Sequence, residues 1–188
     1  MRNLDFDPMN LPQEILAAIG LVASCSAHTE YVIEEGIGGC SGLDIEYTAA
    51  FATHMAVPMR DQVFRALAEI RMNDLDDLDK LDELLDEVSA SMKVRNTYVH
   101  NSVCKDKDTG ELLITTTTAR GSVEVDLFPV TVGQIKRDAA RIYNAGLALY
   151  RFLGKRGLLA EVPPSPRPRD HKSRAARKKR RETLAKGK

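Results

Sequence analysis

The stretch TVGQIKRDAARIYNAGLALYRFLG, residues 131–154, carries the clearest structural pattern in the chain. Apolar or small residues recur in it at intervals of three or four positions: Ile135, Ala139, Ile142, Gly146, Leu149 and Phe152. That interval places them on one side of an α-helix, which predicts a long helix with one buried face. Thr131 and Gln134 form a capping box at its start, and Gly154 or Gly157 is expected to end it.

The residues just before this helix have a different character. LLITTTT (residues 112–118) and SVEVDLF (residues 122–128) are rich in β-branched residues and are joined by Ala-Arg-Gly. Two such runs with a short connection predict a β-hairpin over about residues 111–128. Because a two-stranded hairpin is barely stable alone, we expect it to lie against the helices or against a partner chain.

Helical patterns also fill most of the first hundred residues. A first helix is expected from Asn10 to the glycines of GIGGCSG, residues 36–42, which we interpret as a helix stop. Two shorter helices are expected to begin at Asp44 and Pro58. A long helix is then expected to start at Asn73 or Asp74 and to continue through an acidic, leucine-rich segment.

These elements predict an all-α fold, an antiparallel helical bundle of four to five helices with the β-hairpin inserted before the last helix. The helical domain is expected over residues 1–158, and residues 159–188 are expected to form a disordered basic tail. The net charge of zero conceals this division. Residues 163–188 hold 11 Lys and Arg and 2 acids, whereas the preceding residues hold 16 and 25. This asymmetry indicates a basic tail on an acidic domain.

Composition also bounds the environment of the protein. The three cysteines are far apart and form no CxxC pair, which argues against a zinc site or a disulfide framework and fits a reducing compartment. No apolar run stands out as membrane-spanning, and the start MRNLDFDPMN does not resemble a signal peptide. The sequence therefore predicts a cytoplasmic protein with no metal, no cofactor and no membrane partner.

The segment KVRNTYVHNSV, residues 93–103, brings Arg95, Asn96 and His100 together near the end of the long helix. Asn96 and His100 are four residues apart, so they share a helix face and the amide could orient the imidazole. Arg95 follows Met92 by three residues and points toward the apolar side. A guanidinium there is costly unless it is paired or lies beside a solvent-filled cleft. The set could bind a phosphate and transfer a proton during RNA cleavage without a metal.

A purely structural role for these residues remains open. In that interpretation Arg95 pairs with Glu30, with Glu34 or with another acid of the bundle, while His100 caps the helix end. The tail leaves a similar choice between RNA attraction and simple solubility, because a cationic segment without aromatic residues can contact phosphates but offers no platform for bases.

The heptapeptide RNTYVHN, residues 95–101, resembles the R-N-x-x-x-H signature of HEPN domains (higher eukaryotes and prokaryotes nucleotide-binding). Those domains are compact helical bundles that carry the motif on a late helix. AIGLVASCSAHTEYVIEE, residues 18–35, resembles the first helix of the family, and MAVPMRDQVFRALAEI, residues 55–70, resembles its second or third. The resemblance spans about residues 10–155.

This resemblance implies a metal-independent endoribonuclease that cleaves RNA through attack of the ribose 2′-hydroxyl, in a toxin or antiphage-defence role. It implies catalytic roles for Arg95 and His100, a supporting role for Asn96 and a contribution from Glu30. Members of the family pair so that two motifs line one cleft. A homodimer is therefore expected, and an antitoxin or defence-system protein is a candidate partner. The chain departs from the family pattern in its hairpin, and it lacks the Tyr after the motif that marks toxins silenced by tyrosine modification.

The candidate RNA contacts are all cationic. Lys93 lies beside the motif, and the others belong to the tail: Arg174, Arg177, Lys178, Lys179, Arg180 and Arg181. Contacts of this kind would be made to phosphates and would weaken with salt. The alternative function is a non-catalytic helical HEPN module that binds RNA or a protein or acts as a regulatory subunit.

Overall fold

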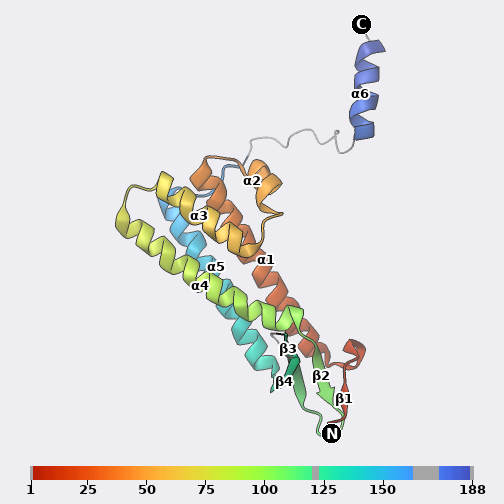
Figure 1. The fold of residues 1–188 in the computed structure, drawn as a ribbon. Coiled ribbons are helices and arrows are strands. Elements are labelled where there is room, and N and C mark those ends of the chain that lie inside the picture. Colours follow the sequence, from red (N-terminus) through yellow and green to blue (C-terminus); the bar gives the residue numbers. More distant parts are fainter. Residues whose placement is uncertain (1, 120–122, 163–173, 187–188) are drawn as a thin grey trace.

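The computed structural model describes residues 2–119, 123–162 and 174–186. This part of the chain is mostly helical and carries a small antiparallel sheet (Figure 1). The helices are α1 (Gln13–Ser41), α2 (Ile45–Ala52), α3 (Val57–Arg71), α4 (Leu75–His100), α5 (Val132–Arg156) and α6 (Arg174–Lys186). The strands are β1 (Leu4–Asp5), β2 (Val103–Asp106), β3 (Leu112–Ala119) and β4 (Val123–Pro129), and a short 3-10 turn, η1 (Pro8–Asn10), precedes α1.

The most extensive helix contact joins α1 to α5. Gly146 of α5 lies directly against Thr29 of α1, so that an added Cβ would stand 2.5 Å from the Thr29 hydroxyl oxygen. That hydroxyl lies 3.0 Å from the carbonyl oxygen of Cys25 in its own helix and 3.1 Å from that of Ile142 in α5. The buried Thr29 hydroxyl thus has hydrogen-bond acceptors in both helices. Glycine at position 146 is what allows the two backbones to approach this closely.

Helix α4 lies along α5 in the opposite direction. Arg141 of α5 pairs with Glu87 of α4, and Arg156, further along α5, pairs with Asp77 near the start of α4. Between the helices lies an aliphatic core, as the low aromatic content requires. Its fully buried large side chains include Ile15, Val22, Ile37, Phe64, Leu81, Leu85, Ile135, Ile142, Leu149 and Leu153.

Of the glycines of GIGGCSG, only the last one stops the first helix. Helix α1 continues through Gly36 and ends at Gly42, which has the left-handed conformation with φ of 69°. Inside the helix the missing side chains serve close packing. A Cβ on Gly36 would stand 2.1 Å from the ring of Phe64 in α3, and one on Gly39 would stand 2.1 Å from the carbonyl oxygen of Leu158. Only Gly42 acts as the expected terminator.

The start of the first helix also differs from the prediction. Asn10 does not cap α1; its side-chain amide donates to Asp5 at 3.0 Å, and α1 begins at Gln13 behind Pro12 without a side-chain cap. Asp5 belongs to β1, which pairs with β2, so the N-terminal segment is part of a sheet rather than the lead-in to a helix.

The expected hairpin is present as β3 and β4, with Ile114 opposite Phe128 and Thr117 opposite Val125. It is not isolated. The sheet has four strands in the order β1-β2-β3-β4, all antiparallel, so the all-α prediction missed two strands. Leu113 and Ile114, near the base of the hairpin, are buried and pair with β2, and Ile114 belongs to the hydrophobic core, so the hairpin has the support that two strands alone would lack.

The C-terminal boundary lies later than predicted. Leu158 and Ala160 are buried, and the Ile45 amide donates to the carbonyl oxygen of Glu161, so the packed domain continues past residue 158. Residues 174–186 form helix α6, whereas the sequence predicted disorder for the whole tail. Residues 163–173 lie outside the described part of the chain.

By length and composition α1 is apolar enough to cross a membrane, which the sequence analysis did not anticipate. In this structure one side of α1 is part of the core, with Val22 and Ile33 almost inaccessible to solvent. The same apolar composition thus serves internal packing on that side of the helix.

Gly36→Ala should lower the free energy of unfolding by about 1–3 kcal/mol, because its Cβ would overlap the ring of Phe64, which is fully buried. Gly133→Ala is the control, since its Cβ would meet only the Arg137 guanidinium, at 3.6 Å. Urea denaturation of both variants measures the difference. Equal midpoints would show that the ring yields without cost.

Candidate functional site

The Arg95–Asn96–His100 motif occupies the last two turns of α4. Asp74 caps the start of this helix by accepting hydrogen bonds from the Asp76 and Asp77 amides. His100 is the final helical residue, and Asn101 takes an extended conformation that leads into β2. The motif therefore lies where the helical domain meets the sheet.

The three motif residues form one connected cluster. The Arg95 Nη1 atom donates to the Asn96 side-chain oxygen at 3.1 Å and lies 3.2 Å from His100 Nε2. A guanidinium can only donate hydrogen bonds, so in this contact His100 Nε2 is the acceptor and the ring proton is assigned to Nδ1. An imidazole of that tautomer can accept a proton from a substrate at Nε2 once the contact is released.

Asn96 does not contact His100 as expected; instead, Arg95 contacts both of them. Both contacts in the cluster belong to the guanidinium, and the amide orients the arginine rather than the imidazole. Asn96 and His100 are both exposed to solvent, so a ligand could reach the cluster without a conformational change in the helix.

Arg95 lies within the buried stripe of α4. Val88 and Met92 before it and Tyr98 after it are buried, and Arg95 itself is half-buried. Its Nε atom is inaccessible and has no hydrogen-bond partner within the described residues. No ion pair joins Arg95 to a carboxylate in that part of the chain, so the charge is not compensated as the structural alternative required. A half-buried cation without an acid is costly and provides a place for an anionic ligand.

A pocket of about 350 Å³ adjoins the motif on its α3 side. Asn96 and Lys93 of α4 form one wall, and Val57 and Pro58 at the start of α3 form the other, with Asp61 beside them. Lys93 is exposed, so this wall offers a solvent-accessible cation next to the Asn96 amide.

Glu30 is not part of the motif cluster. Its carboxylate binds Arg60 of α3 at 3.2 Å, and Glu34 binds the same guanidinium at 3.3 Å. Arg60 is buried, and it also donates to the carbonyl oxygens of Ala52, at 2.9 Å, and Thr53, at 3.1 Å. This Arg60 clamp ties α1 to the loop that precedes α3. Helix α3 forms a wall of the pocket, so the clamp connects Glu30 to that helix and not to the motif.

Tyr98, between the motif residues, attaches the end of α4 to α5. Its hydroxyl donates to the Asp138 carboxylate, and its ring is buried. Burial raises the pKa of the Tyr98 hydroxyl above its ordinary value, and the hydrogen bond to Asp138 acts in the same direction. Sequence analysis did not single out this pair, because the two residues are 40 positions apart in different helices.

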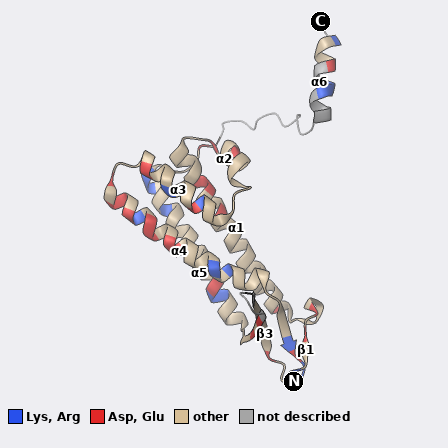
Figure 2. Cartoon of the chain, viewed as in Figure 1, with Lys and Arg blue, Asp and Glu red and all other residues tan. Residues whose placement is uncertain are grey.

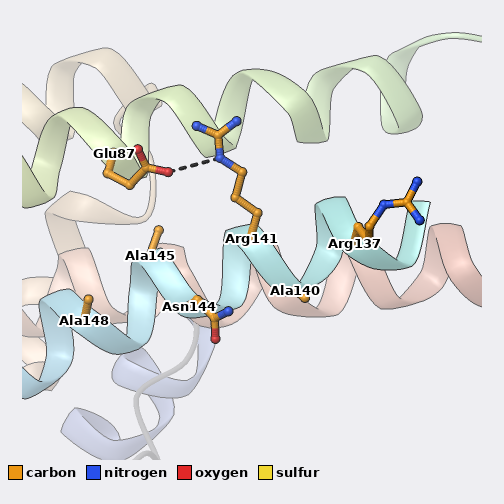
Figure 3. A pocket seen from close by; sticks show the side chains of 7 residues that line it. All are labelled: Glu87, Arg137, Ala140, Arg141, Asn144, Ala145 and Ala148. Atoms are coloured by element: carbon orange, nitrogen blue, oxygen red, sulfur yellow. Dashed lines mark hydrogen bonds and ion pairs between the residues drawn. The ribbon is translucent and has the colours of Figure 1, made fainter. Parts of the chain in front are cut away.

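A second pocket, about 490 Å³ in volume and shallow, lies on the α5 side of α4 (Figure 3). Alanines form much of its floor, and Arg137 and Arg141 project from α5 along its edge. Arg141 pairs with Glu87 at 3.0 Å, whereas Arg137 has no ion pair within the described residues. Arg137 precedes Asp138, the partner of Tyr98, so it adds a cation close to the motif helix that sequence analysis missed.

The tail candidates are only partly described. Lys178 and Lys179 are exposed on α6, and Lys178 lies 4.0 Å from Glu182. The side chains of Arg174, Arg177, Arg180 and Arg181 lie outside the described part of the structure. The first half of α4, by contrast, presents a dense row of acids (Figure 2). This row carries the opposite charge to α6 and is an unsuitable surface for RNA.

Tyr98→Phe should lower the free energy of unfolding by about 1–2 kcal/mol at neutral pH, because Asp138 loses its partner. Since folding raises the pKa of Tyr98, the stability from this pair is present in full below about pH 10 and is lost as the pH rises further. Urea titrations from pH 7 to pH 11 should therefore show a smaller alkaline loss for Tyr98→Phe than for the wild type. Tyr143→Phe is the control, since Tyr143 is exposed; parallel curves for Tyr98→Phe and the wild type would contradict the assignment.

Comparison with known proteins places no further constraint on the site. No family model, no curated protein and no solved structure matches the chain.

Proposed function

We propose that the protein is a metal-independent endoribonuclease of HEPN type. The observation that carries this proposal is the exposed end of α4, where the Arg95 guanidinium and the His100 imidazole meet at 3.2 Å with no carboxylate bound to Arg95 in the described residues. An unpaired cation beside a neutral imidazole is what cleavage of a ribose phosphate ester requires. The finer fold assignment, an antiparallel HEPN-like helical bundle with an inserted hairpin, belongs to the same proposal.

In the proposed reaction a phosphate of RNA takes the place of His100 as the partner of Arg95. His100 Nε2, released from that contact, accepts the proton of the ribose 2′-hydroxyl as the 2′ oxygen attacks phosphorus. The bond from phosphorus to the 5′ oxygen breaks, and an acid protonates that leaving oxygen. Arg95 stabilises the additional negative charge on the phosphate oxygens, and the products are a 2′,3′-cyclic phosphate and a 5′-hydroxyl.

The proposed setting follows from the same resemblance. The protein would act in the cytoplasm as a toxin or in antiphage defence, as a homodimer and with an antitoxin or defence protein as a candidate partner. RNA would be held by Lys93 at the pocket and by the cations of α6.

Arg95→Ala and His100→Ala should each lower the rate of RNA cleavage by about 100-fold or more, because each removes a group that acts in the transition state. The measurement is the appearance of cyclic-phosphate ends on a labelled single-stranded RNA in the presence of EDTA. His54→Ala and Arg151→Ala are matched controls, since both residues are exposed and lie outside the motif.

Binding is measured separately on an RNA with 2′-O-methyl riboses, which cannot be cut by this route. Retained binding by His100→Ala together with lost cleavage supports the proposal. Wild type that binds RNA but cleaves no faster than both motif variants would exclude the nuclease and favour the non-catalytic module.

Deletion of residues 163–188 should weaken binding to that RNA and flatten its dependence on salt. The removed segment holds 11 Lys and Arg, and each phosphate contact contributes about 0.7 to the logarithmic salt slope on a single strand. Titrations at several salt concentrations measure the slope. An unchanged slope would show that the tail does not contact RNA.

A further inference from the structure

The outward side of α1 is exposed yet carries no charge. Seven solvent-facing positions form one stripe on this side, with the exposed Leu16 and Ala23 at its edge, and we call these seven the α1 face: Ala17, Gly20, Leu21, Ser24, Ala27, His28 and Tyr31. Between Glu14 and Glu30 the helix has no Lys, Arg, Asp or Glu at all. The exposed sides of α4 and α5, by contrast, carry acids and arginines, as the colours of Figure 2 show.

The large exposed side chains of the α1 face and of its surroundings are aliphatic or aromatic. Leu21 is 45% exposed and Tyr31 is 47% exposed, and on the adjacent side of α5 Tyr143 and Tyr150 are 42% and 41% exposed. Tyr143 lies against His28, with ring centroids 5.5 Å apart, so the two helices contribute to one continuous patch. An exposed patch that is apolar and uncharged indicates that another molecule binds to this surface.

Two copies of the α1 face, packed antiparallel, would be complementary in the size of their side chains. When the helix is turned end for end about Ser24, Tyr31 meets Ala17, His28 meets Gly20 and Leu21 meets Ala27, and Ser24 meets itself. Each large side chain thus faces a small one, in both directions, as a two-fold symmetric interface requires. Gly20 contributes open space, since an added Cβ there would find no atom within 4 Å.

We propose that a second copy of this chain covers the α1 face, with the two α1 helices packed antiparallel about a two-fold axis at Ser24. From Ala17 to Tyr31 the face is about 21 Å long. A specific interface buries about 800 Å² on each partner, and the α1 face together with the exposed Tyr143 and Tyr150 of α5 is the surface available for it. The proposal stands on this face alone and does not depend on ribonuclease activity.

Other occupants fit the face less well. It carries no cation for RNA or for anionic lipid headgroups. Insertion of α1 across a membrane would expose its opposite side, where Val22 and Ile33 belong to the core. A charged protein partner would leave its own charges unpaired against this surface. A second identical face has none of these costs.

Light scattering coupled to size exclusion should give a mass for the full chain that is twice its 20.8 kDa. Ser24→Arg places two guanidiniums against each other at the axis and should weaken the dimer at least about 100-fold. Ala148→Arg is the matched control, an exposed alanine of α5 outside the face, and it should remain dimeric. Circular dichroism establishes that both variants are folded, as the exposure of both positions leads us to expect.

The orientation is tested by paired charges. Leu21→Lys and Ala27→Glu should each weaken the dimer, and the double variant should recover it, because antiparallel packing places each lysine opposite a glutamate of the second copy. A monomeric wild type, a dimer that survives Ser24→Arg, or a double variant no tighter than its parents would overturn the proposal. A monomeric wild type that floats with phosphatidylcholine–phosphatidylserine vesicles would assign the face to a membrane instead.

Discussion

The approach of α1 to α5 at Thr29 and Gly146 is the constraint from which the rest of the structure follows. Because the two backbones approach closely there, the apolar stripes of both helices face one interior, and α4 packs against both helices. The inward-facing side of α4 continues beyond its apolar residues. At the level of Arg95 the position is still inward-facing, and a guanidinium occupies it. The half-buried charge of the motif is therefore a direct result of helix packing.

Elements with a local pattern could be predicted from the sequence, and elements that depend on distant contacts could not. Helix α5 has a cap, a regular apolar stripe and a terminating glycine within its own residues, and β3 and β4 are adjacent in the chain. The two missed strands pair across about a hundred residues, from Leu4 to Asp106. The glycines of α1 were misinterpreted for a similar reason, because their purpose is set by Phe64 and Leu158 in later segments.

The same distinction applies to the candidate site. Arg95, Asn96 and His100 belong to one helix, so their proximity could be predicted, although the bridging role of the arginine could not. The groups that support them come from other helices: Asp138 through Tyr98, and Arg60 through the pocket wall. Glu30 was placed at the motif by resemblance, whereas the structure engages it in the Arg60 clamp. Contacts between helices determine these roles, and the spacing of residues within one helix does not predict them.

The Arg60 clamp has an evolutionary consequence. One planar guanidinium satisfies carbonyl oxygens from the loop before α3 and two carboxylates of α1 at the same time. The compact ammonium of lysine cannot reach acceptors that diverge in this way, and an uncharged residue would leave Glu30 and Glu34 without a cation. Lineages that descend from this sequence should thus keep arginine at position 60 and lose it only together with both glutamates. Divergence there would proceed by concerted replacement, while exposed neighbours such as Met59 drift independently.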